Sequence, residues 1–169
     1  MRRIISMLLQ NEVGALGRVA GLFSARGYNI DSLTVATTHD AAISRLTLVT
    51  AGDDAVISQI IKQSRKIVDV LEIVDLTGRE HLETELVMVK VDVVPERLVD
   101  LVACLRRHPR AQVLDISAGV RTAEFTGDGA EIDAFLADIA RVGDVLEIAR
   151  SGTAAIERGT RVLAVPVST

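Results

Sequence analysis

The chain has 169 residues, of which 49% are hydrophobic and 25% charged, as expected for one medium or two small globular domains. Its formal net charge is −4 and it contains no basic run, so a polybasic nucleic-acid binder is excluded. The single cysteine, Cys104, excludes an intrachain disulfide framework and suits a reducing compartment. No apolar run is long enough for a transmembrane helix. We therefore expect a cytoplasmic protein that does not bind a membrane.

Hydrophobic periodicity predicts six elements in the first half of the chain. In chain order they are a strand at 4–9, a helix at 13–25, strands at 30–37 and 43–50, a helix capped by Asp53 or Asp54, and a strand at 70–76. Val13, Leu16, Val19, Ala20 and Phe23 recur at helical spacing on the first helix, and Val68 belongs to the apolar face of the second. Gly27 is placed to end the first helix in a left-handed conformation. The order is βαββαβ.

The second half predicts the same order of elements. They are a strand at 86–94, a helix that starts at Pro95 and buries Leu98, Leu101, Val102 and Leu105, strands at 112–117 and 120–126, a helix at 130–142, and a strand at 145–149. The pentapeptide Asp-Val-Leu-Glu-Ile occurs in both closing strands, at 69–73 and at 144–148. Together these observations predict a duplicated architecture.

The predicted fold is α+β, with two ferredoxin-like βαββαβ domains. A polar stretch and a shift in charge divide them, because residues 1–78 carry eight basic and eight acidic side chains and the net −4 lies beyond. We predict a first domain at 1–78, a linker at 79–84, a second domain at 85–161 and an apolar, β-prone tail at 162–169. Each sheet is expected to carry two helices on one face and to leave the other face and the edges open, so a homodimer is expected.

The segment that joins the first strand to the first helix is the most informative part of the sequence. Gly14 lies inside the first helical turn, where glycine costs about 1 kcal/mol relative to alanine. One interpretation is a tight turn. The other is that Gly14 lets a ligand carboxylate approach the unsatisfied N–H groups of a helix N-terminus, with the side-chain amide of Asn11 nearby.

A second polar position, Asn29, follows the end of the first predicted helix. It is one of only two asparagines in the chain, the other being Asn11. Asn29 is interpreted either as an ordinary turn residue or as an amide that pairs with a ligand ammonium or carboxylate group. Neither asparagine can act as a general base.

Four runs of the first half form a distinctive pattern: Asn11-Glu12-x-Gly14-Ala15-Leu16-x-Arg18-Val19, Arg26-Gly27-Tyr28-Asn29-Ile30, Ser44-Arg45-Leu46-Thr47 and Lys66-x-Val68-x-Val70-Leu71. A fifth run in the second half is Glu85-Leu86-x-Met88-Val89-Lys90-Val91. Together these runs closely resemble the ACT domain and following region of acetolactate synthase (acetohydroxyacid synthase) small subunits, and the resemblance covers nearly the whole chain. The resemblance departs at 106–110 and 121–127, where the family is more apolar or carries an aromatic strand.

The resemblance implies a non-catalytic regulatory subunit that activates a large catalytic subunit and makes it sensitive to valine. Thiamine diphosphate, Mg²⁺ and FAD are then expected in the catalytic partner and not in this chain. The effector would lie between two chains, where one supplies the strand-to-helix loop and the other the Asn29 region. The residues that the resemblance assigns to the effector are Asn11, Gly14, Ala15, Leu16, Asn29 and Ile30. The alternative is a free-standing ACT-domain sensor that regulates another partner.

Other candidate sites have simpler interpretations. Gly127-Asp128-Gly129 resembles the start of a thiamine-diphosphate motif but lacks the later asparagine, and it is interpreted as a hairpin turn or a turn into a helix. His39, His81 and His108 are far apart in sequence, so no metal site is predicted. Cys104 is interpreted as a small buried residue. No catalytic residues are predicted.

Overall fold

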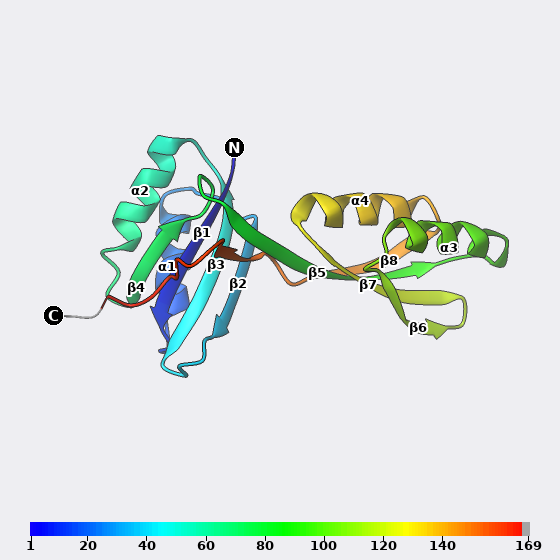
Figure 1. The fold of residues 1–169 in the computed structure, drawn as a ribbon, viewed down its shortest axis with the longest axis horizontal. Coiled ribbons are helices and arrows are strands. Elements are labelled where there is room, and N and C mark those ends of the chain that lie inside the picture. Colours follow the sequence, from blue (N-terminus) through cyan, green and yellow to red (C-terminus); the bar gives the residue numbers. More distant parts are fainter. Residues whose placement is uncertain (167–169) are drawn as a thin grey trace. The chain divides into compact units, whose positions relative to one another are not determined.

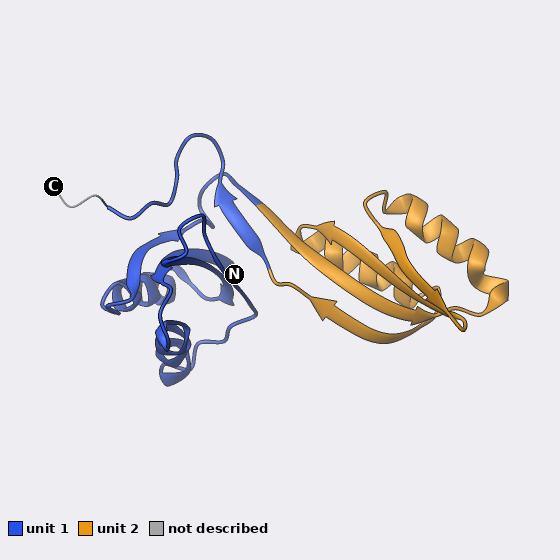
Figure 2. Cartoon of the chain, turned by 90° about the horizontal axis from the view of Figure 1, so that it is seen from below, with its two compact units in different colours: residues 1–82, 153–169 blue, residues 83–152 orange. Residues whose placement is uncertain are grey.

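A computed structural model describes residues 1–166, which fold as two compact units. The first unit comprises residues 1–82 together with residues 153–166, and the second comprises residues 83–152 (Figure 2). No helix within residues 1–166 is long and apolar enough to cross a membrane.

The first unit is a four-stranded antiparallel sheet with two helices on one face (Figure 1). Its elements are β1 (Arg2–Gln10), α1 (Ala15–Ala25), β2 (Ser32–Thr37), β3 (Ile43–Ala51), α2 (Asp54–Ser64) and β4 (Val70–Asp75). The strand order is β2-β3-β1-β4, so β2 and β4 are the edges. The core between sheet and helices includes Ile5, Met7, Phe23, Leu48 and Ile60.

The second unit repeats this topology with the order β6-β7-β5-β8. Its elements are β5 (His81–Asp92), a 3₁₀ turn (Pro95–Arg97), α3 (Leu98–Arg107), β6 (Gln112–Ser117), β7 (Val120–Gly127), α4 (Gly129–Ala140) and β8 (Asp144–Arg150). Its core includes Val89, Cys104, Phe125, Phe135 and Ile139. The predicted fold class, two βαββαβ domains, is confirmed.

Capping residues at the helix ends make the interactions that their side chains and conformations predict. The Asp53 carboxylate accepts a hydrogen bond from the Val56 N–H group at 2.8 Å, which caps α2. Asp128 caps α4 in a reciprocal capping box with Glu131. The Gly-Asp-Gly run is therefore a helix entry. Gly27 follows α1 with φ 68°, the left-handed conformation that ends many helices.

Three valines that helical periodicity assigned to buried helix faces are exposed in the structure. Val13 is fully exposed because α1 starts only at Ala15. Val68 is 80% exposed because α2 ends at Ser64. Val102 is 49% exposed because the buried face of α3 is centred on Leu101 and Cys104, and Val102 lies at its edge.

The domain boundaries differ from the predicted ones. The predicted linker, 79–84, already contains the first residues of β5, which starts at His81. The predicted second domain also loses its end, because β9 (Ala154–Glu157) belongs to the first unit. The described part of the predicted tail, 162–166, has no regular secondary structure, and residues 167–169 lie outside the described chain.

Strand β9 packs on the face of the first sheet that lies opposite its helices. Ala155 is buried in a small cluster with Ile4, Val49 and Leu76. The Arg45 guanidinium donates through Nη2 to the Ala155 carbonyl at 2.8 Å. The prediction that this face stays open is thus wrong for the first unit, since a segment remote in sequence covers it.

Placing a carboxylate at Ala155 tests how much this cover contributes to stability. We expect Ala155→Asp to lower the free energy of unfolding of the first unit by at least about 2 kcal/mol, because the charge would be buried among aliphatic side chains. The matched control is Ile156→Asp on the same strand, where the side chain is 53% exposed. Urea unfolding should leave the control close to the parent, and equal destabilisation of both variants would contradict the packing described.

Candidate functional site

The loop between β1 and α1 leaves a helix N-terminus without a side-chain cap. Gly14 is the N-cap residue and has φ 87°, which L-amino acids other than asparagine and aspartate rarely adopt. Helices α2 and α4, by contrast, are capped by the carboxylates of Asp53 and Asp128. The N-terminus of α1 therefore carries partial positive charge and has no side-chain cap from its own chain.

A guanidinium group lies directly beside this N-terminus. A Cβ atom placed on Gly14 would come within 2.8 Å of Arg18 Nη1. The other two nitrogens of Arg18 bind Asp69, with Nε to Oδ2 at 2.5 Å and Nη2 to Oδ1 at 2.7 Å. The Arg18 hydrogen bond lowers the pKa of Asp69, and the same contact raises the pKa of Arg18. The pair thus holds a permanent cation next to the space that Gly14 leaves open.

The side chain of Asn11 is already used within the chain. Its Nδ2 donates to the Ala41 carbonyl at 2.9 Å, and its Oδ1 accepts from the Ser44 hydroxyl at 3.1 Å. Its backbone N–H also donates to the Ala42 carbonyl at 2.8 Å. Asn11 therefore fastens the loop to the β2–β3 hairpin through both its side chain and its backbone N–H group.

The remaining predicted residues differ in their exposure. Ala15 is buried and Leu16 is 39% exposed. Asn29 is exposed, with its side chain donating to Asp31 at 2.5 Å. Ile30 is half-buried against the first core.

Within one chain the two predicted groups do not come together. The Asn11 loop is bonded to Ser44, whereas the Asn29 carbonyl accepts from the Thr50 hydroxyl at 2.5 Å. Ser44 and Thr50 lie near opposite ends of β3, about 20 Å apart at the usual rise of a strand. A site that contains both groups must therefore use two chains.

Arg18 and Asp69 were not singled out by the sequence analysis. A signal was available, because Arg18 lies four residues after Gly14, one helical turn away. The partner was hidden, since Asp69 is 51 residues from Arg18 in sequence. The matching pentapeptide residue of the second unit, Asp144, is exposed, so the repeat alone does not predict burial.

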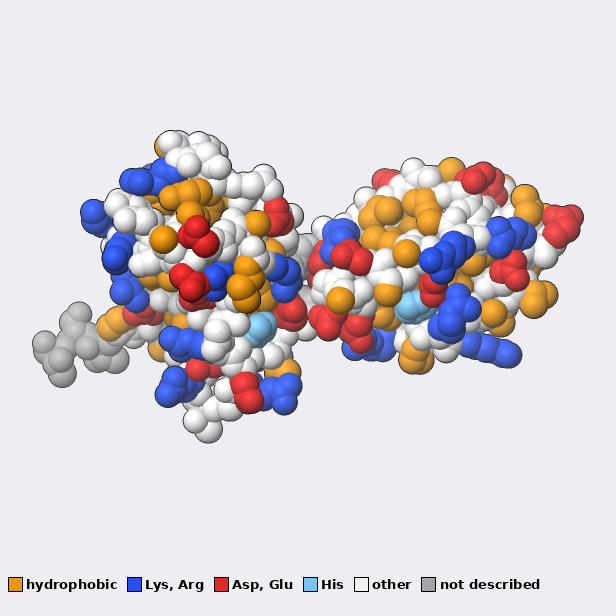
Figure 3. Space-filling view, turned by 90° about the horizontal axis from the view of Figure 1, so that it is seen from above, with side chains coloured by type: hydrophobic (Ala, Val, Ile, Leu, Met, Phe, Trp, Pro, Cys, Tyr) orange, Lys and Arg blue, Asp and Glu red, His pale blue; other side chains and the backbone are white. Residues whose placement is uncertain are grey.

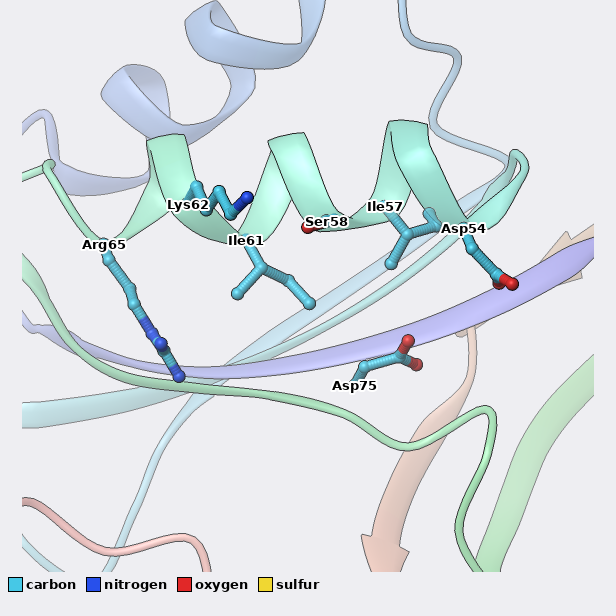
Figure 4. Close-up of a pocket in the computed structure, with 7 residues that line it drawn as sticks. All are labelled: Asp54, Ile57, Ser58, Ile61, Lys62, Arg65 and Asp75. Carbon is cyan, nitrogen blue, oxygen red and sulfur yellow. The ribbon is translucent and has the colours of Figure 1, made fainter.

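A separate groove of about 350 Å³ runs along α2 and is not lined by the predicted residues. Figure 4 shows Asp54 and Asp75 toward one end and Lys62 and Arg65 toward the other. The side chain of Asp54 is already ion-paired with Arg3. The charges in this groove are of both signs, as they are over the face drawn in Figure 3, where acidic and basic side chains are interspersed.

Comparison with known families matches both units. The family described as AHAS small subunit-like ACT domain matches residues 5–72. The family described as small subunit of acetolactate synthase matches residues 84–159.

Individual relatives match the chain along almost its whole length. It is 45% identical to the acetolactate synthase isozyme 3 small subunit of Escherichia coli K12, over 96% of this chain and 99% of that protein. It is 42% identical to the acetolactate synthase small subunit of Haemophilus influenzae, over 95% and 98%. The crystal structure of the acetolactate synthase small subunit from Thermotoga maritima superposes with a TM-score of 0.84 at 31% identity, over 95% of this chain and 99% of that one.

Acid should weaken the pair that supports the loop. Because the pKa of Asp69 is lowered in the folded state, its contribution to stability is complete above the ordinary aspartate pKa near 3.9 and is lost as the pH falls through the lowered value. We expect Arg18→Gln to be clearly less stable than the parent at pH 7, with the difference shrinking toward pH 3. Urea unfolding over this range measures it.

The control for this experiment is Arg65→Gln, whose guanidinium is 63% exposed and lies 4.0 Å from Glu72. This variant should remain near the parent throughout, because exposed pairs contribute little. A stability difference for Arg18→Gln that is the same at pH 3 and pH 7 would show that the interaction with Asp69 is not its source.

Proposed function

Since the chain belongs to the acetolactate synthase small-subunit family, we propose that it activates the catalytic large subunit of acetolactate synthase and confers feedback inhibition by valine. The observation that carries this proposal is the match of both units to that family over nearly the whole chain. Thiamine diphosphate, Mg²⁺ and FAD are assigned to the catalytic subunit, and this chain is assigned no catalytic role.

The uncapped N-terminus of α1 supports an amino-acid effector at this position. The Ala15 N–H group already donates to the Glu12 carbonyl at 3.2 Å, so a valine carboxylate would accept hydrogen bonds from the next N–H groups of the first helical turn, beside the Arg18 guanidinium. The exposed part of Leu16 offers an apolar contact to a branched side chain. The positive φ of Gly14 favours glycine at this position, and glycine has no Cβ atom that would block the approach.

A homodimer formed through β2 would complete this site. β2 is an edge strand of the four-stranded sheet, and edge strands can pair with the corresponding strand of a second copy. If two β2 strands pair antiparallel, the start of one lies beside the end of the other. Asn29 and Ile30 of one chain would then approach the hairpin to which the other chain fastens its Asn11 loop.

Reconstitution tests the proposed function. The purified chain alone should form no acetolactate from pyruvate. Added to its cognate catalytic subunit, it should raise the turnover rate, and valine should then lower that rate. Acetolactate formation by the chain alone, or a catalytic subunit that binds the chain without any change in rate or in valine sensitivity, would contradict the proposal.

Changing Gly14 in the reconstituted enzyme locates the effector. We expect Gly14→Asp to raise the half-inhibitory valine concentration at least about tenfold, because a carboxylate would take over the N–H groups and Arg18, and one charge-assisted hydrogen bond contributes about 1.5–3 kcal/mol. Gly14→Asn is the matched control, since asparagine has nearly the same shape and tolerates positive φ without the charge. Activation should survive in both variants.

The two Gly14 variants separate charge from shape. Gly14→Asn should retain more valine sensitivity than Gly14→Asp. An unchanged half-inhibitory concentration in Gly14→Asp, with a valine-sensitive parent, would place the effector elsewhere.

A charge at the middle of β2 tests the dimer. Val35 is 41% exposed on this strand, and antiparallel pairing would bring the two copies of residue 35 close together. We expect Val35→Glu to shift sedimentation from dimer toward monomer and to weaken valine inhibition, because like charges would oppose across the strands. Val68→Glu is the control, at an 80% exposed position away from β2. Dimers of undiminished stability in Val35→Glu would rule out this interface.

A further inference from the structure

Three side chains with metal-binding atoms meet in the second unit, far from the effector residues in sequence. Cys104 lies on α3, His108 ends that helix, and Asp138 lies on α4. The Cys104 Sγ, an imidazole nitrogen of His108 and a carboxylate oxygen of Asp138 all lie within 4.8 Å of one another. Within residues 1–166 no other group of three His, Cys, Asp or Glu side chains gathers in this way.

We propose that these three residues form a binding site for one Zn²⁺-like divalent cation. Thiolate sulfur, imidazole nitrogen and carboxylate oxygen are the ligands that Zn²⁺ takes in proteins, and three protein ligands leave a fourth position for water. The thiolate and the carboxylate together neutralise the two positive charges of the ion. As the sulfur–metal bond forms, the thiol proton passes to the solvent.

The backbone already presents the ligands to a common point. Cys104 and His108 are four residues apart, so they lie on the same face of α3. The His108 Nε2 is 3.0 Å from Asp138 Oδ2, which brings α4 to that face. Ligand atoms around tetrahedral Zn²⁺ lie about 3.3–3.8 Å apart. The three ligand atoms here lie within 4.8 Å of one another, so rotation of their side chains is enough to bring them to these distances.

The surroundings hold the imidazole in place. The His108 ring packs edge-on against Phe125 and Phe135, with centroid distances of 5.6 and 5.3 Å. The Cys104 side chain is fully buried, while His108 and Asp138 keep 13% and 21% of their side chains exposed. An ion can therefore enter from the His108–Asp138 side and reach the buried sulfur.

Two arginines share the Asp138 carboxylate. Arg107 Nε lies 3.2 Å from Oδ2 and Arg141 Nη1 lies 3.3 Å from Oδ1. Their guanidinium groups are 57% and 79% exposed, so solvent screens their repulsion of a cation. Arg141 can keep its contact with Oδ1 and orient the carboxylate while Oδ2 turns to the metal, as outer partners do in metal sites.

Bound metal would fasten the end of α3 to α4. The second unit has about 70 residues, and the core of so small a unit contributes little stability by packing alone. A metal cross-link between its two helices would therefore raise its stability. The site is independent of the proposed function, because it requires neither valine nor a partner subunit.

Titration of the metal-free full-length chain with Zn²⁺, with Co²⁺ as a spectroscopic probe, tests the site. We expect one equivalent per chain, a thiolate-to-cobalt charge-transfer band in the near ultraviolet, and a higher melting temperature with Zn²⁺. Cys104→Ala, His108→Gln and Asp138→Asn should each bind at least about a hundredfold more weakly, since even outer-partner changes cost ten- to a hundredfold. His81→Gln should bind like the parent, because His81 lies outside the group and contacts the Arg79 carbonyl.

The proposal is overturned if the parent binds no stoichiometric Zn²⁺, or if Cys104→Ala and His108→Gln both keep parental affinity. It is equally overturned if the Co²⁺ complex lacks the charge-transfer band. Circular dichroism checks that each variant is folded. Should Cys104→Ala fail to fold, the partly exposed His108 and Asp138 decide the outcome through their own variants.

Discussion

The ion pair between Arg18 and Asp69 is the constraint on which the first unit's loop geometry depends. Asp69 places a carboxylate in a buried position just before β4, and the bidentate guanidinium of Arg18 is its main compensation. Its backbone carbonyl also accepts the N–H group of Gln10 at 2.9 Å, so the end of β1 is tied to the same residue. Because Arg18 belongs to α1, the end of β1, the start of β4 and the first turn of the helix are held together around Gly14.

The order of elements could be predicted because it rests on local patterns. Alternating and helical spacings of aliphatic residues identify each strand and helix, and Asp53, Asp128 and Gly27 act within a few residues of their own positions. The starts of helices were less predictable. Val13 has the spacing of a helical residue, but the helix starts only at Ala15 because Gly14 before it has a positive φ.

The sites depend on residues that are distant in sequence, and local patterns do not show which distant residues come together. The chemistry of a glycine at a helix N-terminus could be inferred from the loop alone, but not the cation that Asp69 holds beside it. The Cys104–His108 spacing was visible, whereas Asp138 joins these residues from another helix, 30 positions after His108. A covered sheet face was equally hidden, because nothing local in 153–157 indicates that it packs on β1 and β3.

The return of β9 to the first unit reverses the usual order of folding during synthesis. Domains generally fold from the N-terminus as they leave the ribosome. Here residues 83–152 form a contiguous unit, while the outer face of the first sheet stays uncovered until Ala155 has been made. Until then Ile4, Val49 and Leu76 form an apolar surface on the nascent chain. Such a surface is a binding site for chaperones and a point at which incomplete chains can associate prematurely. The N-terminal unit is thus begun first and finished last.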